Sequence, residues 1–575
     1  MSLGIYTDLK TQVIDSLKSL QTEGFLPEKM CYDNVVVEQP KDISHGDFAT
    51  NAAMVLSKQA RKNPREIAER LAGSLEGKAG IVKAEVAGPG FLNFRMDKEQ
   101  FHNQVNLILE KSVAYGASEQ GVGHKVMVEY VSINPTGPIH VGHGRNAVYG
   151  DSLANLLEKA GYNVWREYYL NDAGGQIHTI IQSVHLRYRE LFGEEITLPD
   201  GCYPGDYVID IAQTLKDKDG DKWLAVTDKQ ELFDGLRVFC VEACMKLIRA
   251  DLDVLDIHFD EYFSEYAMHQ QDAMGKAVQA LRDKDDIYEG TLPPPKGKEV
   301  EDYVPEELTL FRSEKYGDDV DRAIYKKNGE ATYFGADIAY HNNKLERGFD
   351  TLINIWGADH AGAVKRLKSA LTSLTGRKDA LDIILTQMVR IYKNGEAVKM
   401  SKRAGNFVLL KDVLDEVGPD AVRFLMLNRK NDTHFDFDLT KALEKSNDNP
   451  VFYVQYAHAR ICAVYRQQRE MGIETVDPKT VDLSLLDKPQ EIDLIRLLCL
   501  YPLVIDRSAA AHEPHRVAFY ASELAGAFHS WYNAEKFLVE EDVPLTQARL
   551  ALAKATQIIL VDSLSVLGVS APERM

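Results

Sequence analysis

The spacing of apolar and polar residues divides the chain into three regions of different secondary structure. In the first region, up to about residue 112, a helical pattern near 5–20 precedes two alternating stretches within 81–96 that a Gly-Pro-Gly turn joins as a hairpin. From about 450 to the end, apolar residues recur at three- and four-residue spacing. The pattern therefore predicts an α+β unit at the start of the chain and a helical unit at its end.

Between these two regions, strand-like and helix-like segments alternate. Buried-strand patterns precede helical patterns at Lys125–Val131 with 144–159, Asn163–Tyr169 with 175–191, and Thr351–Trp356 with 361–374, and a further strand pattern starts at Asp382. Such alternation is typical of a parallel sheet, so we predict an α/β fold. The alternation blurs over about 192–330, which holds a long helical pattern near 228–253 and a Pro-Pro-Pro run, and we interpret this region as an insertion.

Composition adds limits to this picture. A chain of 575 residues with 45% hydrophobic and 27% charged residues is typical of a multi-domain globular protein. Taken over the whole chain, the net charge of −20 argues against binding to nucleic acid, because phosphates attract clustered Lys and Arg. Residues 361–411, however, hold 11 basic and 3 acidic residues and form a basic island. We therefore expect any polyanion to bind at this basic island.

The cysteines and apolar runs indicate a reduced, cytoplasmic protein. The six cysteines are scattered, and Cys240 and Cys244 have no second Cys or His pair nearby, so we expect no structural zinc. The start of the chain lacks the pattern of a signal peptide. Apolar runs such as Leu497–Ile505 are too short to span a bilayer, so we expect no membrane association.

The first motif with chemical content lies between the first strand and helix of the predicted sheet. It reads Ser-Ile-Asn134-Pro-Thr-Gly-Pro-Ile-His140-Val-Gly142-His143-Gly. A helix N-terminus at the end of a strand attracts anions, and two imidazoles beside Gly142 would add donors to a phosphate. Two alternatives are a glycine-rich turn with capping histidines and a loose dinucleotide fingerprint starting at Gly142, which leaves the histidine pair unexplained.

The second motif is Lys399-Met400-Ser401-Lys402, which follows a strand and the turn at Gly395. By itself it would be interpreted as a solvated basic loop. Together, in this order, the two motifs resemble the signatures of class I aminoacyl-tRNA synthetases.

Further segments narrow the resemblance to the arginyl-tRNA synthetase family, over essentially the whole chain. They are Glu129-Tyr-Val-Ser-Ile-Asn134, Tyr168-Tyr-Leu-Asn-Asp172-Ala-Gly-Gly-Gln, Ala331-Thr-Tyr333-Phe-Gly-Ala-Asp337 and Tyr453-Val-Gln-Tyr456-Ala-His-Ala-Arg. Many members carry a lysine where this chain has Gly137, and those members often lack the second lysine that is present here as Lys402. We interpret this exchange of lysines as a need for a single positive charge at the phosphates, which either loop can supply.

The resemblance implies a domain organisation. We expect an N-terminal accessory tRNA-binding domain at 1–112, a Rossmann-like catalytic domain at 113–407 with the insertion at about 192–330, a connecting helical segment at 408–449, and an α-helical anticodon-binding domain at 450–575.

It also implies an activity, which is ATP-dependent ligation of L-arginine to its tRNA through an arginyl-adenylate, with release of AMP and pyrophosphate. The arginine carboxylate would attack the α-phosphate of ATP in line, a step that relies on positioning and charge stabilisation. The ATP site would comprise His140, Gly142, His143, His360, Lys399, Met400, Ser401 and Lys402. His140, His143, Lys399 and Lys402 would be catalytic, and Mg²⁺ would accompany ATP without a metal site on the protein.

A guanidinium group needs carboxylates in bidentate geometry, often beside an aromatic ring. Tyr333 and Asp337 lie four residues apart, which places them on one face if the segment is helical. By resemblance they hold the guanidinium, with Glu129 as a second carboxylate, while Asn134 and Asp359 hold the α-amino end. A surface ion pair of Asp337 with Lys344 or Arg347 is the alternative, and His360 could be an ordinary residue at a helix start.

The helical end of the chain would bind the anticodon of the arginine tRNA. Bases stack on aromatic side chains, and Tyr453, Tyr456, Trp531 and Tyr532 are the candidates, although aromatic residues in helices often belong to the core. We expect a monomer.

Two other functions remain open on sequence grounds. A nucleotidylyltransferase could use the same phosphate loop, although such chains are usually shorter and have no need for a helical tail. A synthetase-like RNA-binding protein without activity is disfavoured by the presence of His140, His143, Lys399 and Lys402.

Overall fold

The computed structural model describes residues 4–40, 42–292, 306–398, 408–474 and 476–575. Two compact units account for the whole chain. The first combines Met1–Gln120, Pro450–Val566 and Ser570–Met575, and the second combines Gly121–Asn449 with Leu567–Val569.

The beginning of the first unit is an α+β fold. Its elements are α1 (Ile5–Thr22), β1 (Val37–Glu38), β2 (Phe48–Thr50), α2 (Ala52–Ala60), α3 (Pro64–Leu75), β3 (Ile81–Ala87), β4 (Phe91–Met96) and α4 (Lys98–Lys111). The strands form an antiparallel sheet in the order β1-β2-β4-β3. The predicted hairpin is confirmed, with Ala87 opposite Phe91. At α3, the Asn63 side chain accepts the Arg65 N–H and Pro64 occupies the first turn, a strong start signal.

The end of the chain supplies the long helices of the first unit, as the sequence predicts. They are α16 (Pro450–Glu470), α17 (Pro489–Ala510), α18 (His515–Ala534) and α19 (Val543–Val566). Two buried ion pairs of Arg549 on α19 join this helix to Glu491 on α17 and to Glu535 after α18. These charges are paired inside the bundle, so their burial leaves none of the three groups unsatisfied.

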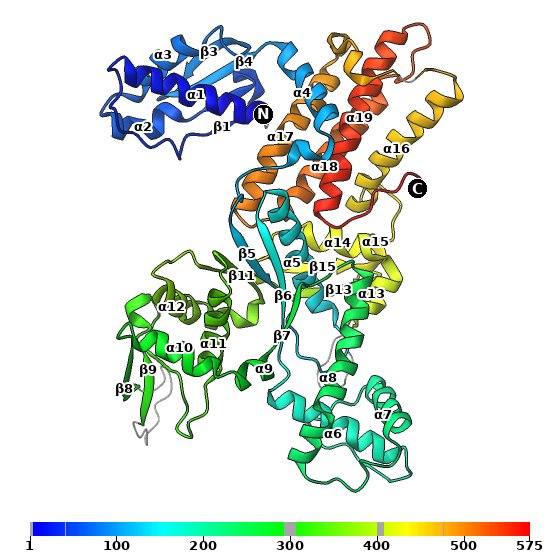
Figure 1. Ribbon diagram of the computed structural model, residues 1–575. Helices are drawn as coiled ribbons and strands as arrows, with labels where there is room; N and C mark the ends of the chain where they lie inside the picture. The colour runs from blue at the N-terminus through cyan, green and yellow to red at the C-terminus, as the bar shows by residue number, and fades with distance from the viewer. Residues whose placement is uncertain (1–3, 41, 293–305, 399–407, 475) are drawn as a thin grey trace. The chain divides into compact units, whose positions relative to one another are not determined.

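The second unit is built on a five-stranded parallel sheet, which Figure 1 shows between layers of helices. Its strands and the helices between them are β5 (Lys125–Glu129), α5 (Val141–Lys159), β6 (Asn163–Leu170), α6 (Gly175–Glu190), β7 (Glu261–Ser264), α11 (Tyr333–Glu346), β11 (Thr351–Gly357), α12 (Val364–Thr375) and β12 (Leu381–Thr386). The strand order is β12-β11-β5-β6-β7, and every neighbouring pair is parallel. The predicted alternation is therefore confirmed.

The region interpreted as an insertion contributes to this sheet as well. Besides β7, it contains α7 (Asp206–Asp219), α8 (Lys229–Val254), α9 (Glu265–Gln270), α10 (Ala273–Arg282), β8 (Ile287–Thr291), β9 (Glu307–Phe311) and β10 (Arg322–Ala323). Strand β7 extends the parallel sheet beside β6, so part of the region interpreted as an insertion belongs to the sheet, through a strand that the sequence pattern did not predict. Its four residues, Glu-Tyr-Phe-Ser, are too few to show a pattern of their own.

A small mixed sheet follows β12. It comprises β13 (Val389–Lys393), β14 (Glu396–Ala397) and β15 (Phe435–Asp438), with the helices α13 (Leu410–Val417), α14 (Pro419–Leu427) and α15 (Leu439–Ala442) alongside. The guanidinium of Arg145, on α5, donates to the carbonyls of Gln387, Thr433 and Lys430. Arg145 thereby fixes this sheet to the helix that carries the first motif.

The chain leaves β5 through a strained turn. Val131 and Ser132 have φ angles of 64° and 43°, in the left-handed region that a β-branched residue such as valine rarely adopts. The side chain of Asn146 accepts the Val131 N–H at 2.7 Å and donates to the Ile355 carbonyl of β11 at 2.7 Å. Since Asn146 is buried on α5, one amide holds the turn between two strands and the helix.

We expect Asn146→Ala to lower the stability of the protein by about 2–4 kcal/mol, because a buried N–H and a buried carbonyl both lose their partner. Thermal unfolding followed by circular dichroism would measure the loss. Asn155→Ala is the matched control, since Asn155 lies on the same helix but is only half buried. Equal losses in the two variants would show that Asn146 does not hold the turn.

Candidate functional site

The first motif lies where β5 passes into α5, at the carboxyl edge of the parallel sheet. His140 is the residue that caps the start of α5, and His143 lies in the first turn. Their rings are 3.9 Å apart between centroids. A Cβ at Gly142 would lie 3.1 Å from Nδ1 of His140, so a glycine gives that ring its room. Two imidazoles thus stand together at a helix N-terminus, an arrangement suited to a phosphate.

The described chain that resumes at Val408, after the second motif, runs beside the first motif. The Val141 N–H donates to the Val408 carbonyl at 3.0 Å, and the Leu410 N–H donates to the Ile139 carbonyl at 2.9 Å. The predicted residues Lys399, Met400, Ser401 and Lys402 lie outside the described residues. The hydrogen bonds place Val408 and Leu410, which are among the first described residues after this gap, next to the Ile139–Val141 segment that holds His140.

Helix α11 carries the predicted guanidinium site. The Thr332 hydroxyl accepts the Gly335 N–H and caps the helix, so Tyr333 is its first residue and Asp337 follows one turn later. Tyr333 is 87% exposed, and Asp337 is half buried. No described residue forms a hydrogen bond or ion pair with the Asp337 carboxylate. Burial raises the pKa of Asp337 to about 7, opposed by the charge of Arg366 and reinforced by Glu129 and Glu265.

The alternative in which Asp337 pairs with Lys344 or Arg347 is wrong. Lys344 is fully buried and donates to Glu129 at 2.5 Å and to Asn354 at 3.2 Å. Arg347 instead pairs with two other carboxylates, Glu167 at 2.6 Å and Glu261 at 2.8 Å. The cations of α11 therefore neutralise carboxylates of the sheet and leave Asp337 without one.

Glu265, the first residue of α9, is a site residue that the sequence reasoning missed. Its side chain is 14% exposed, and its Oε2 atom is buried with no hydrogen-bond partner among the described residues. Oε1 lies 3.4 Å from Nε2 of His269. Burial and then the charges of Glu265 and Asp337 raise the pKa of Tyr169, so both carboxylates act on this one phenol. An acidic residue directly after a strand was the available signal, but β7 itself was not recognised.

The remaining predicted residues of the sheet edge are more open. Asn134 donates to the side chain of Gln176 at 2.9 Å. Asp359 and His360 belong to a short 3-10 helix, Ala358–Ala363, that follows β11, and Nε2 of His360 lies 3.7 Å from a carboxylate oxygen of Asp359. Asn134 lies in the loop that follows β5, and Asp359 and His360 directly follow β11, so all three come after strands of the same sheet.

The predicted tRNA contacts on α16 and α18 fall into two groups. Arg460 lies between the rings of Tyr456 and Tyr532, at 4.4 and 4.7 Å, and Tyr453 packs on His529. These tyrosines are half buried and have accessible surface. Trp531 is 0% exposed, with its ring 4.1 Å from that of Phe537, which corrects the expectation for this residue because a core side chain has no free face for a base.

Comparison with known proteins decides the family. The models described as "Arginyl tRNA synthetase N terminal domain", "tRNA synthetases class I (R), catalytic domain" and "DALR anticodon binding domain" match residues 7–96, 104–463 and 454–575. The arginine–tRNA ligase of Ruegeria pomeroyi is 48% identical over 100% of both chains, and that of Magnetococcus marinus is 48% identical over 97% of this chain and 98% of its own. The chain belongs to the arginyl-tRNA synthetase family.

Membership in the arginyl-tRNA synthetase family establishes the activity. The enzyme is a class I aminoacyl-tRNA synthetase that joins arginine to its tRNA and uses ATP as a substrate. The solved arginyl-tRNA synthetase of Thermus thermophilus has the same fold, with a TM-score of 0.75 at 21% identity over 99% of this chain and 100% of its own. Among the described residues, no helix is long and apolar enough to cross a membrane.

The basic island of this synthetase is largely neutralised in three dimensions. Of its eight described cations, six are ion-paired with acidic residues: Lys365 with Asp319, Lys368 with Asp382, Arg377 with Asp379, Arg390 with Asp436, Lys393 with Glu416 and Lys411 with Asp415. Exposed ion pairs of this kind contribute little stability, but they cancel charge. The linear count therefore overstates the attraction of this segment for a polyanion.

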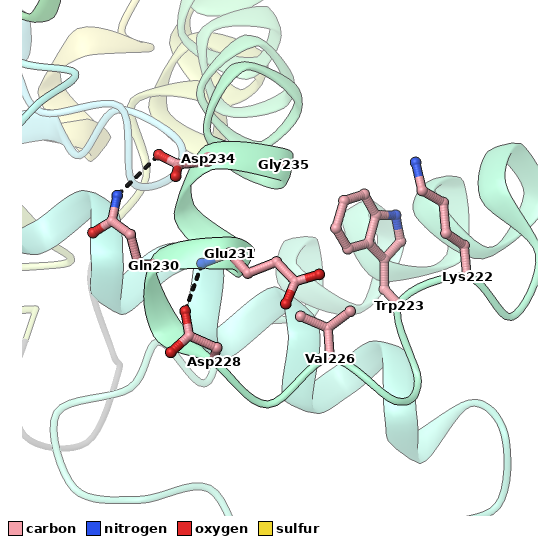
Figure 2. Close-up of a pocket in the computed structure, with 8 residues that line it drawn as sticks. All are labelled: Lys222, Trp223, Val226, Asp228, Gln230, Glu231, Asp234 and Gly235. Atoms are coloured by element: carbon pink, nitrogen blue, oxygen red, sulfur yellow. Dashed lines mark hydrogen bonds between the residues drawn. The ribbon is translucent and has the colours of Figure 1, made fainter.

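A hollow of about 720 Å³ lies elsewhere in the synthetase, between the end of α7 and the start of α8 (Figure 2). Its lining consists of Lys222, Trp223, Val226, Asp228, Gln230, Glu231, Asp234 and Gly235. The polar residues bond among themselves: Asp228 accepts the Glu231 N–H, and Gln230 donates to Asp234. None of the predicted site residues lines it, so we separate this hollow from the catalytic site.

We expect Lys344→Met to lower the stability of the synthetase by about 3–5 kcal/mol, because it leaves the Glu129 carboxylate buried without a counter-charge. Glu129→Gln combined with Lys344→Met should be clearly more stable than Lys344→Met alone, since both charges are then gone. Thermal unfolding of the three proteins would compare them. A double variant as unstable as the single one would contradict the assignment of Glu129 as the partner.

Proposed function

We propose that this synthetase charges tRNA in two steps at the carboxyl edge of the β5–β6 sheet, first forming arginyl-adenylate and then transferring arginine to the 2′-hydroxyl of the terminal ribose. The observation that carries the proposal is the pair of adjacent imidazoles, His140 and His143, at the N-terminus of α5. Donors preorganised there would stabilise charge as it develops on the α-phosphate.

At the ATP end, His140 and His143 are assigned to the α-phosphate, and Lys399 and Lys402 to the β- and γ-phosphates. Gly142, Met400, Ser401 and His360 complete the nucleotide site. The two hydrogen bonds between Ile139–Val141 and Val408–Leu410 support this assignment, because Val408 follows the lysine motif by six residues in the sequence and lies beside the strand-to-helix turn that carries the histidines. Mg²⁺ would arrive with the phosphates of ATP, and we assign it no ligand from the protein.

At the amino-acid end, we assign Asp337 and Glu265 to the guanidinium and Tyr333 to its flat face. Neither carboxylate forms an ion pair with a lysine or arginine among the described residues, and two such groups in a part-buried site suit a planar cation with five N–H donors. Glu129, the second carboxylate expected from the sequence, is already paired with Lys344, so we replace it by Glu265 in this role. Asn134 and Asp359 are assigned to the α-amino group.

For the tRNA, we assign the anticodon to the partly exposed surface formed by Tyr453, Tyr456, Arg460 and Tyr532. Arginine and tyrosine side chains both offer flat faces on which unpaired bases can stack. The N-terminal α+β region is assigned to another part of the tRNA. We further propose a cytoplasmic monomer, without structural zinc.

ATP–pyrophosphate exchange with each of the twenty amino acids, with and without tRNA, tests the proposal. Of the twenty amino acids, we expect only arginine to support exchange, and we expect this exchange to require tRNA. His143→Ala should slow exchange by a factor of about 10² to 10³, because one donor to the developing charge is lost. Exchange with a different amino acid, or an unchanged rate in His143→Ala, would overturn the assignment.

We expect arginine to bind more tightly as the pH rises through about 7. Burial raises the pKa of Asp337 to about 7, so its carboxyl is protonated below that pH and ionised above it, and only the ionised form attracts the guanidinium. The dissociation constant for arginine should fall with rising pH and level off above about pH 8. Isothermal titration across this range would show the trend, and Asp337→Asn should bind weakly with no inflection near 7.

A further inference from the structure

Asp172 lies just beyond the carboxyl end of β6, and its side chain is only 6% exposed. Three donors satisfy its carboxylate. Oδ1 accepts the Tyr266 N–H at 2.8 Å, and Oδ2 accepts both the Ser264 hydroxyl at 2.8 Å and Nη1 of Arg237 at 2.9 Å. The guanidinium of Arg237 in turn lies 3.7 Å from the ring centroid of Tyr266. The charge of Arg237 offsets that of Asp172, so the buried site holds no unpaired charge.

Two of these donors lie immediately before and after Glu265. Ser264 is the residue that caps α9, where its hydroxyl also accepts the Ala267 N–H at 3.0 Å. The Asp172 carboxylate therefore holds the residues on both sides of Glu265, through the Ser264 hydroxyl and the Tyr266 N–H, at the point where β7 ends and α9 begins. Glu265 has one buried oxygen, Oε2, that forms no hydrogen bond of ordinary length among the described residues, and the phenol of Tyr169 is a polar neighbour of this carboxylate. An unsatisfied buried acceptor stays in place only if the surrounding structure holds it there.

We propose that Asp172 is a positioning residue for arginine recognition, which holds Glu265 in the orientation that a guanidinium ion requires. The inference rests on the proposed assignment of Glu265 to the substrate guanidinium. Asp172 touches no substrate in this account and acts only through Glu265. Charge-assisted bidentate recognition depends on the direction of the carboxylate, so a rotation of the start of α9 weakens arginine binding without removing any contact residue.

The chain contains a matched control at Asp318. That carboxylate is also buried, and it accepts the same three kinds of donor: the Ser313 hydroxyl at 2.8 Å, the Asp319 N–H at 2.7 Å and the guanidinium of Arg322 at 2.7 Å. It lies in the inserted region next to β10 and flanks no predicted site residue. Asp318→Asn therefore imposes a similar structural loss at a place with no role in the substrate site.

The experiment is isothermal titration of L-arginine into the full-length protein and its variants. Asp172→Asn should weaken arginine binding about tenfold, and Asp318→Asn should change it by less than about twofold. Citrulline, in which a neutral ureido group replaces the guanidinium, should compete equally well in Asp172→Asn and in the unaltered protein. A general loosening of the site would weaken both ligands alike and would overturn the inference.

A double-mutant cycle tests whether Asp172 acts through Glu265. Once Glu265→Gln has removed the charge, adding Asp172→Asn should weaken arginine binding by less than about twofold further. Full additivity of the two effects would overturn the inference. If Asp172→Asn does not fold, Ser264→Ala removes a single donor of the same cluster and should weaken arginine binding about threefold. An unaltered protein that fails to bind arginine would overturn the proposed function together with this inference.

Discussion

Neutralisation of buried carboxylates by two cations of α11 is the interaction on which the site depends. Glu129 on β5 and Glu167 on β6 lie side by side in the sheet, and each would be costly to bury alone. Lys344 and Arg347 pair with them and so fasten α11 across the strands. Helix α11 can then present Asp337, about two turns before Lys344, with no ion-pair partner among the described residues. A site for a cation thus arises because Glu129 and Glu167 are neutralised by ion pairs, while Asp337 has no such pair in the described part of the chain.

At the nucleotide end of the site, backbone geometry positions the two histidines. The strained residues after β5 are held by a single amide, Asn146, and the chain then enters α5 with both histidines at its first turn. The guanidinium of Arg145, the next residue after the motif, donates hydrogen bonds to backbone carbonyls beside the small sheet of β13 and β15. Neighbouring residues at the start of one helix therefore hold the strained turn, fix the small sheet and supply the two imidazoles.

Much of the fold could be predicted from the local pattern, because the spacing of apolar residues in a long segment indicates both its secondary structure and the face that it buries. The hairpin of β3 and β4, the alternation around the parallel sheet and the final helices all agree with the sequence interpretation. Strand β7 could not be recognised because four residues carry too little pattern. Because β7 was not predicted, Glu265 was not recognised as a site residue, since only its place at the carboxyl edge of the sheet indicates a functional role.

By itself, the sequence determined the family, the order of the elements and the two motifs, because each is encoded in residues near one another along the chain. The tertiary structure decided which charges remain available. It paired Lys344 with Glu129, neutralised most of the described basic island and buried Trp531 in a helical core. The physical reason is that the electrostatic effect and accessibility of a side chain depend on its neighbours in space, and those neighbours come from segments that are up to hundreds of residues away in the sequence.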